Sequence, residues 1–247
     1  METIIFEKKK NHRLRWTFGI INRLKNFYTH RKRLLLLWAM CSIHHMVMAQ
    51  EFHSFDLHQL LKDNKISVYN RDVNTIQEYK YKGIKLSKNE GEGMAWIDDF
   101  DFSNGIIEFD VRGENVKQHS FVGLAFHGVD NDTFDAVYLR PFQFKESDPK
   151  LRRRSIQYIS LPEFTWRKLR ELFPEKYENE VISAPDPDSW IKMRVVIDGS
   201  LISVFIDNDT KPVLILTKLT STKSGKLGFY TGDTSGGDFA NLKVMKK

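Results

Sequence analysis

Past residue 50 the chain alternates apolar and polar residues in short runs, and these runs are separated by Gly, Asn and Asp. A period of two residues bounded by turn residues predicts β-strands. The clearest strands are expected at Gly105–Arg112, Phe121–His127, Phe134–Phe142, Ser155–Ile159, Trp190–Asp198, Leu201–Asp207, Val213–Thr217, Lys226–Tyr230 and Phe239–Met245. The pairs Asp198-Gly199 and Asp207-Asn208 are typical of tight hairpin turns. Runs at this spacing predict an all-β chain folded as an antiparallel sandwich or barrel.

Two segments carry a helical rather than a strand pattern. Phe55–Leu61 predicts a short helical turn, and Pro162–Tyr177 spaces its apolar residues at roughly helical intervals between two strands. The second segment also contains Trp166, Lys168 and Arg170. Because insertions between the strands of a rigid scaffold often carry binding residues, we expect residues 162–177 to be a helical insertion with a role in binding.

The first 49 residues have the composition of an export signal. The basic cluster Arg31-Lys32-Arg33 precedes an apolar run that begins at Leu34 and continues weakly to Ala49. This run is too short and too interrupted to predict a stable membrane span. We therefore expect a leader with a signal peptide over residues 1–49, a single β-sandwich domain over residues 51–247, and a secreted or periplasmic protein.

The charge of the chain comes from that leader. The whole chain has 38 basic and 32 acidic residues and a net charge of +6, but residues 1–50 hold ten of the basic and two of the acidic ones, which leaves 28 against 30. A near-neutral exported domain argues against a nucleic-acid partner. The sole cysteine, Cys41, also lies in the leader, so the mature chain has no disulfide and no thiolate ligand or nucleophile.

Several motifs along the strands resemble one family. The segment from Phe121 to Phe142, with its Tyr138-Leu-Arg-Pro-Phe core, is similar to a core strand of bacterial concanavalin A-like lectin/glucanase domains. The resemblance continues through Gln157-Tyr158, Asp188-Ser-Trp190, Gly225–Tyr230 and Phe239–Val244. It implies a concanavalin A-like jelly roll of the laminin G-like kind, similar to 3-keto-disaccharide hydrolase-like and family-sixteen-like domains. It is more specific for fold than for activity, because this sandwich hosts lectins, glycosidases and adhesion modules.

One group of polar and aromatic residues could form a carbohydrate site. Tyr138 and Arg140 share a strand face by alternation, His127 ends the preceding strand, and Gln157 follows on the next one. Their donors and acceptors, with the Trp166 ring from the insertion, would suit a sugar. The alternative is a buried polar network in which Arg140 pairs with an acid and fixes the sheet.

A second group resembles a catalytic motif less closely. Glu108, Asp110 and Arg112 share one strand face, and carboxylates two residues apart occur in laminarinase-type glycosidases. The third carboxylate of that motif is displaced by one residue, at Glu114. Oppositely charged pairs on a solvent-facing sheet explain the run equally simply.

Two loops carry charge without a decisive spacing. Asp130-Asn131-Asp132 and Asp135 could hold Ca²⁺ through oxygen ligands, or could simply form a turn. We expect no other metal and no other cofactor. The basic run Lys150–Arg154, with Lys168 and Arg170, could contact an acidic polysaccharide or a phosphate, or could be a solvated loop.

Three functions remain open on these observations. The first is a lectin-like module that binds glycan near Tyr138, Arg140 and Trp166. The second is a glycoside hydrolase or lyase in the same cleft, with His127 as a base and with several acids near loop ends, none of them favoured by spacing: Glu92, Asp98, Asp99, Asp135 and Glu163. The third is an adhesion or protein-interaction module. Carbohydrate association is favoured through the resemblance; no G-x-S-x-G, P-loop or dinucleotide motif is present in the sequence.

Overall fold

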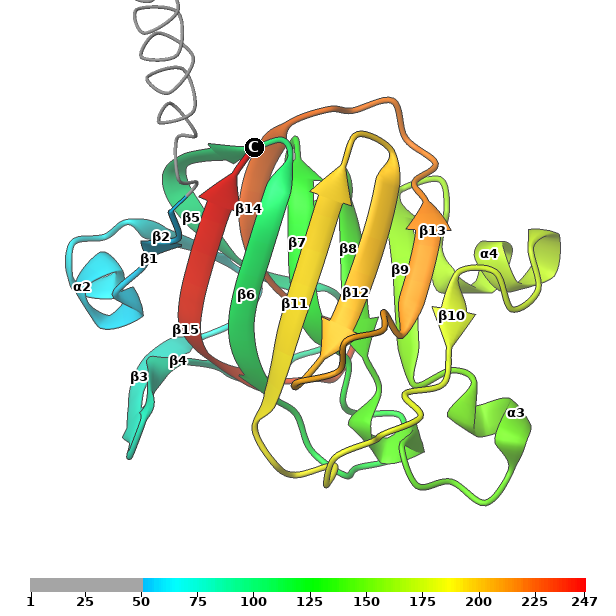
Figure 1. Cartoon of the computed structure of the whole chain (residues 1–247). Coiled ribbons are helices and arrows are strands. Elements are labelled where there is room, and N and C mark those ends of the chain that lie inside the picture. The colour runs from blue at the N-terminus through cyan, green and yellow to red at the C-terminus, as the bar shows by residue number, and fades with distance from the viewer. Residues whose placement is uncertain (1–50) are drawn as a thin grey trace, which may run out of the picture. The chain divides into compact units, whose positions relative to one another are not determined.

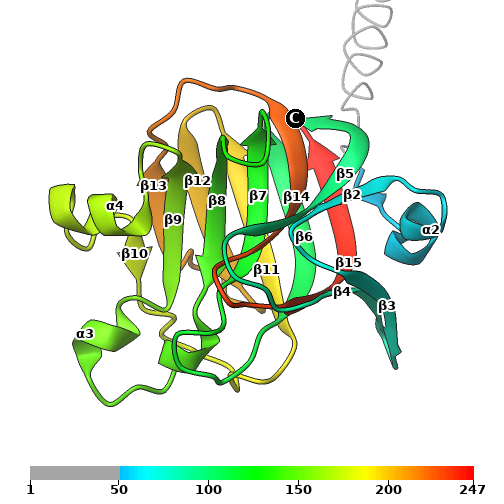
Figure 2. The same cartoon turned by 180° about the vertical axis from the view of Figure 1, so that it is seen from behind.

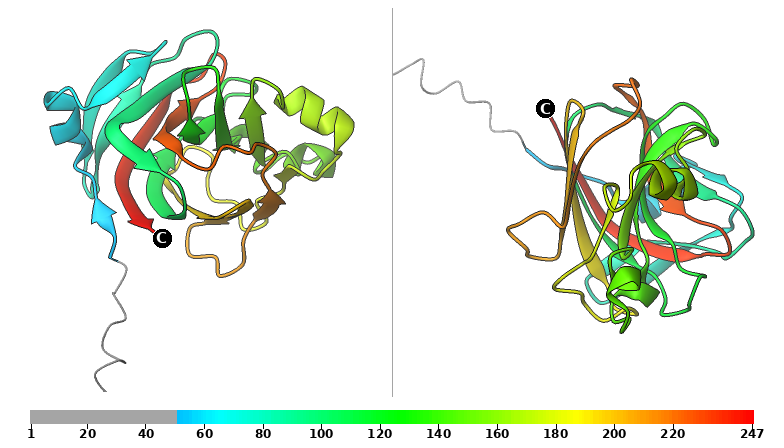
Figure 3. Two further views of the ribbon diagram at one scale, coloured as in Figure 1. Left: turned by 90° about the horizontal axis from the view of Figure 1, so that it is seen from above. Right: turned by 90° about the vertical axis from the view of Figure 1, so that its right-hand side faces the viewer.

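The computed structural model describes residues 51–247, and the predicted leader lies outside them. Within this range the chain forms two antiparallel sheets that lie face to face (Figures 1 and 3). Sheet A has the strand order β13-β12-β11-β6-β15-β4-β3, with β1 paired to β15, and sheet B has the order β10-β9-β8-β7-β14-β5-β2. The predicted antiparallel β-sandwich of the concanavalin A-like type is thereby confirmed.

The strands of the two sheets have the following bounds. Sheet A contains β1 (His53–Ser54), β3 (Val73–Glu78), β4 (Tyr81–Leu86), β6 (Gly105–Arg112), β11 (Ile191–Asp198), β12 (Leu201–Ile206), β13 (Leu214–Thr217) and β15 (Gly237–Lys246). Sheet B contains β2 (Ile66–Tyr69), β5 (Gly93–Phe102), β7 (Val122–Gly128), β8 (Phe134–Leu139), β9 (Ile156–Leu161), β10 (Glu178–Asn179) and β14 (Gly225–Thr231). All nine predicted strands occur, with ends shifted by a few residues at most.

The core lies between the sheets. Phe229 of β14 stacks on Phe239 of β15 with ring centroids 4.6 Å apart, and its ring lies 5.8 Å from that of Phe109 of β6. All three are at most 1 % exposed. Full burial of such a ring stabilises the fold by about 1.5–3 kcal/mol. Contacts of this kind hold sheet A against sheet B.

Short helices lie outside the sheets. They are α2 (Leu57–Lys62), the 3₁₀ helix η1 (Pro141–Gln143), α3 (Pro149–Arg152) and α4 (Trp166–Leu172). Figure 2 shows α3 and α4 at the β9–β10 end of sheet B. α4 lies inside the predicted insertion: Thr165 caps it by accepting from the Lys168 amide, and Pro174 follows its end. No helix within residues 51–247 is long and apolar enough to cross a membrane.

Candidate functional site

A row of side chains crosses the outer face of sheet B, the face turned away from the core. Directly paired positions on neighbouring strands carry, in order, Met94, Tyr230, Gly123, Tyr138, Gln157 and Glu178. Paired positions in antiparallel strands project to the same side, so these side chains form one line across the sheet. At Gly123 a Cβ would come within 2.1 Å of the Val137 carbonyl oxygen. Glycine therefore lets the strands approach closely between the two tyrosines.

Arg140 is the central residue of this face. It follows β8 directly, and Pro141 after it ends the strand because proline has no amide hydrogen for the sheet. Its guanidinium donates from Nη2 to Tyr138 Oη at 2.8 Å and to Gln157 Oε1 at 2.7 Å. Nη1 donates to the Arg154 carbonyl at 2.8 Å. The side chain is only 4 % exposed, so a cation is held in a poorly solvated place.

Arg140, Arg154 and Arg170 share a single nearby carboxylate. Glu178 accepts from Arg170 Nε and Nη2, with an Nε–Oε1 distance of 3.0 Å, and lies 3.9 Å from Arg154 Nε. Arg140 makes no ion pair with any of the residues that the structure describes. Burial lowers the pKa of Arg140, and Arg170 lowers it further. This end of the site therefore carries excess positive charge.

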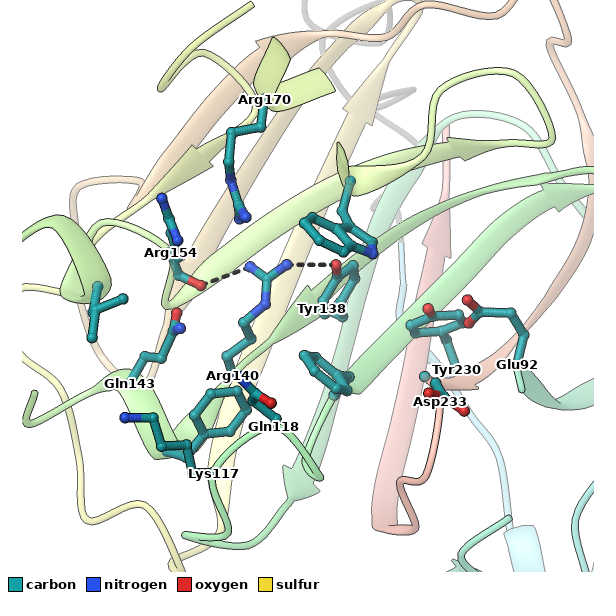
Figure 4. Close-up of a pocket in the computed structure, with 15 residues that line it drawn as sticks. Glu92, Lys117, Gln118, Tyr138, Arg140, Gln143, Arg154, Arg170, Tyr230 and Asp233 are labelled. Atoms are coloured by element: carbon teal, nitrogen blue, oxygen red, sulfur yellow. Dashed lines mark hydrogen bonds between the residues drawn. The ribbon is translucent and has the colours of Figure 1, made fainter. Parts of the chain in front are cut away.

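These residues line a cavity of about 420 Å³ (Figure 4). Its lining contains five aromatic rings, four basic groups and two carboxylates, together with a few neutral side chains: Glu92, Lys117, Gln118, Phe121, Tyr138, Arg140, Phe142, Gln143, Leu151, Arg154, Trp166, Arg170, Tyr230, Gly232 and Asp233. In Figure 4 the basic groups surround Arg140, whereas Glu92, Tyr230 and Asp233 lie on the far side of Tyr138. The cavity therefore has a cationic end and an acidic end.

Burial raises the pKa values of one acid and two tyrosines of the cavity. Burial raises the pKa of Glu92, although Tyr230 and the charge of Arg71 act in the opposite direction. One oxygen of Glu92, Oε2, is buried without a hydrogen-bond partner in the described part of the chain. Burial also raises the pKa of Tyr138 to about 12 and that of Tyr230 well above its usual value. Both phenols thus keep their hydrogen at neutral pH, and the Tyr138 hydroxyl, which accepts from Arg140, can donate to a ligand.

Arg71 fixes the two loops that carry the acids. Its guanidinium donates to the carbonyls of Asn70, Gly91, Gly232 and Ser235 at 2.6–3.0 Å. The Gly91 amide in turn donates to Asp233 at 2.7 Å. Backbone carbonyls held by one guanidinium tie residues 91–92 and 232–235 together, so the acidic wall is pre-formed.

Trp166 forms part of the opposite wall from the first turn of α4. Its ring is 42 % exposed and lies 5.0 Å from the Arg170 guanidinium, a cation–π contact. The structure therefore brings together Tyr138, Arg140 and Trp166 at the cavity, with Gln157 directly behind Arg140. The predicted alternative, a carboxylate partner for Arg140, does not occur within residues 51–247.

His127 does not belong to this group, which corrects the sequence prediction. It lies near the end of β7 and is 2 % exposed. Nε2 donates to the Ser103 carbonyl at 2.7 Å, and Nδ1 lies 3.0 Å from Lys218 Nζ. Lys218 also contacts Asp135, which accepts from Tyr158 at 2.6 Å. Alternation between neighbouring strands did not reveal that β7 and β8 point His127 and Asp135 into a buried network away from the cavity.

The Asp130 loop is built as a turn. Asp130 Oδ1 accepts from the amides of Asp132 and Thr133 at 2.9 and 2.7 Å, and Asn131 accepts from the Trp96 indole. In the described residues, no group of three or more His, Cys, Asp or Glu side chains is placed to hold a metal ion. Nothing in the arrangement of this loop supports the calcium expectation.

The strand with Glu108, Asp110 and Arg112 lies in sheet A, away from the cavity. Its charged face turns outward as predicted, since Ile107, Phe109 and Val111 are at most 1 % exposed. Arg112 pairs with Asp238 at 2.6 Å and with Glu78 at 2.8 Å. Asp110 accepts from Asn241 at 2.6 Å. Paired groups on a sheet surface account for this run.

The basic run is largely neutralised by neighbouring acids. Arg152 pairs with Glu180 and Arg153 with Glu175, at 2.8 and 2.7 Å. Of the run Lys150–Arg154, Leu151 and Arg154 line the cavity. The lining residues that the sequence did not single out include Lys117, Phe121, Tyr230 and Asp233. Only the Tyr230-Thr-Gly-Asp233 turn, after a predicted strand, offered a signal.

No family model matches this chain, and no curated protein matches it. Among solved structures, a Bacillus subtilis protein of unknown function with a galectin-like fold superposes with a TM-score of 0.52 at 14% identity, over 78% of this chain and 94% of that one. The carbohydrate binding module CBM66 from Bacillus subtilis gives a TM-score of 0.51 at 12% identity, over 73% and 95%. At these identities the likeness establishes the fold, a lectin-type β-sandwich.

Proposed function

We propose that the protein binds a saccharide in the cavity on the outer face of sheet B. The observation that supports this most directly is the lining itself, which combines aromatic rings with converging hydrogen-bond groups. Saccharides present apolar ring faces and many hydroxyls, so aromatic and polar groups in one concave site suit them. A fold similar to a structure named as a carbohydrate binding module adds support.

Each wall of the cavity would serve a different part of the ligand. Trp166 is the exposed ring and would stack on a sugar face. Glu92 Oε2, which has no partner in the described residues, would accept from a hydroxyl. Arg140 and the protonated Tyr138 hydroxyl would donate to ring or hydroxyl oxygens.

The test is a glycan array with the full chain beside its Arg140→Ala variant. We expect a restricted set of glycans to bind and that binding to be lost in Arg140→Ala, with the fold checked by circular dichroism. Unchanged affinity in a folded variant would contradict this site. An array without any bound glycan would move the proposal to the adhesion or protein-interaction alternative.

Hydrolysis is a second candidate, because two carboxylates share the cavity. Burial raises the pKa of Glu92, as a general acid requires, and Asp233 supplies a second carboxylate. Glu92→Gln should then abolish release of reducing ends while glycan binding persists. Asp101→Asn, outside the cavity lining, is the control. If the unaltered protein binds glycans but does not cleave them, hydrolysis is excluded and only the binding function remains.

We also propose that residues 1–49 direct export, as the basic cluster followed by an apolar run indicates. N-terminal sequencing of the protein recovered outside the cytoplasm should then begin near Gln50. A recovered chain that still begins at Met1 would contradict cleavage there.

A further inference from the structure

The cationic end of the cavity has hydrogen-bond donors that no protein group uses. A guanidinium has five N–H donors in a fixed plane. Arg140 directs three of them to Tyr138, Gln157 and the Arg154 carbonyl, all of them neutral acceptors. Its Nε makes no hydrogen bond within residues 51–247. This end of the site can therefore donate hydrogen bonds to more oxygen acceptors than the protein supplies.

The charge around Arg140 is also unbalanced. Arg140, Arg154 and Arg170 share the single carboxylate of Glu178, and Glu178 is already held by Arg170 through both of its oxygens. Arg154 reaches it only at 3.9 Å. Burying a charge without a counter-charge is costly, so such clusters are typically completed by another group.

The two carboxylates of the cavity do not balance the charge of this arginine cluster. Figure 4 places Glu92 and Asp233 beyond Tyr138, beside Tyr230. Neither Glu92 nor Asp233 forms a hydrogen bond or ion pair with Arg140 in the described residues. An anionic ligand bound at this end of the cavity would supply the counter-charge that no described carboxylate places directly on Arg140.

Resting on the proposed function, we infer that the saccharide is acidic and that its anionic group lies against Arg140 and Arg154. A planar carboxylate matches the paired donors of a guanidinium, and a sulfate ester offers the same oxygen acceptors. Trp166 stacks on the sugar ring, and Glu92 and Asp233 accept from hydroxyls at the other end. The polarity of the cavity thus fixes the direction in which the ligand lies.

The test compares each acidic saccharide with its own neutral form. The full chain is titrated with uronate-containing oligosaccharides and with their methyl esters, and in a separate arm with sulfated oligosaccharides and their desulfated forms. We expect the charged member to bind at least tenfold more tightly in one arm, because its neutral form lacks the charge-assisted contact with the guanidinium. The affinity of the charged member should fall as the salt concentration rises, because salt screens that contact. The arm that shows the preference identifies the anionic group.

Arg154→Gln tests the site without disturbing the buried centre, since the Arg154 side chain is about one-third exposed. It should lower the affinity for the charged saccharide severalfold more than the affinity for its neutral form, and so reduce the preference for the charged member. Arg153→Gln is the matched control: it removes the same charge one residue away, from a surface pair with Glu175. The control should keep the full preference.

The outcomes separate the two proposals. If neutral and charged members bind equally, the inference of an acidic ligand is overturned while saccharide binding stands. If Arg153→Gln lowers the preference as much as Arg154→Gln, the preference comes from general surface charge and the assigned site is wrong. If no saccharide of either kind binds, the proposed function itself fails.

Discussion

Two buried cations that contact side chains of sheet B, Lys218 and Arg140, differ in how completely their charges are satisfied. Lys218 contacts His127 Nδ1 at 3.0 Å, Asp135 at 3.3 Å, Thr220 at 3.3 Å and the Thr222 carbonyl, so it has more acceptors than its three donors need. Asp135 balances its charge. Arg140 instead has neutral acceptors and donors left over.

The difference separates a structural network from a binding site. A buried ion pair whose partners are satisfied on every side has nothing left to offer a ligand, and its removal affects the fold. A buried cation that borders a cavity and lacks a carboxylate is an incomplete arrangement. Residue types alone would predict a binding site at both clusters. The two differ only in how many of their hydrogen-bond donors and acceptors have partners.

The largest expected effect lies in the cluster around Lys218, called the closed cluster because its charge and donors are all satisfied. Asp135→Ala leaves the Lys218 ammonium buried without its counter-charge and should lower the free energy of unfolding by about 3–5 kcal/mol. Urea denaturation measures this. Asp135→Ala combined with Lys218→Met removes both charges and should recover much of the loss. A loss below about 1 kcal/mol in the single variant would show that the network does not stabilise the fold.

The cluster around Arg140, called the open cluster because it has donors left over, should behave differently. Arg140→Met removes a cation that has no carboxylate partner in residues 51–247, so only its hydrogen bonds to neutral groups are lost. We expect a loss of about 1–2 kcal/mol in the free energy of unfolding. A saccharide at 100 times its dissociation constant should stabilise the unaltered protein by about 2.7 kcal/mol and this variant hardly at all. Equal losses in Arg140→Met and Asp135→Ala would erase the distinction between the clusters.

A smaller effect follows from the pKa of His127. Burial lowers that pKa, and the charge of Lys218 lowers it further, although the Ser103 carbonyl and Asp135 oppose them. The unfolded chain therefore binds this proton at higher pH than the folded one, so the free energy of unfolding decreases as pH falls below the ordinary histidine value of about 6.5.

His127→Gln isolates this contribution. The amide keeps a donor for the Ser103 carbonyl but does not titrate, so the decline between about pH 7 and pH 5 should become shallower. His119→Gln changes a histidine that bonds to Thr234 at the surface and serves as the control. Identical pH profiles for the His127 variant and the unaltered protein would mean that its protonation is not linked to folding.

Strands that alternate cleanly were predictable from the sequence, as were the continuous apolar runs of β7 and β8, whereas β3 and β5 were missed. β11 alternates buried and exposed positions along its whole length and was found almost to the residue. β5 begins with five buried residues, Gly93–Ile97, and then contains Asp98, Asp99 and Asp101, so it shows no period of two. β3 buries little of its length at the edge of sheet A. Strands buried on both faces or on neither leave no periodic signal.

The same limit applies to the site. Tyr138 and Arg140 were predictable because Tyr138 lies on β8 and Arg140 directly follows the strand, so alternation still indicates their relative direction. Glu92, Arg71 and Asp233 come from loops far apart in the chain, and they meet because β5 pairs with both β14 and β2. Register between strands is a tertiary property, and it also explains why His127 was grouped with the wrong cluster.

The smallest effect on stability is expected at Trp166, where the open cluster meets solvent. Its ring is 42 % exposed, so Trp166→Ala should change the free energy of unfolding by no more than about 0.5 kcal/mol. If the ring stacks on a sugar, affinity should nevertheless fall severalfold for acidic and neutral saccharides alike, because stacking does not depend on the ligand's charge.

Trp166→Phe sharpens that expectation, since a smaller aromatic face should keep part of the affinity while alanine keeps little. Tyr79→Ala, which removes a ring that is 96 % exposed on the β3–β4 turn of sheet A, is the matched surface control and should leave binding unchanged. Loss of the acid preference alone in Trp166→Ala would instead mean that the ring acts by orienting Arg170, which it contacts at 5.0 Å. In that case the wall formed by α4 would belong to the cationic end of the cavity rather than to a separate stacking surface.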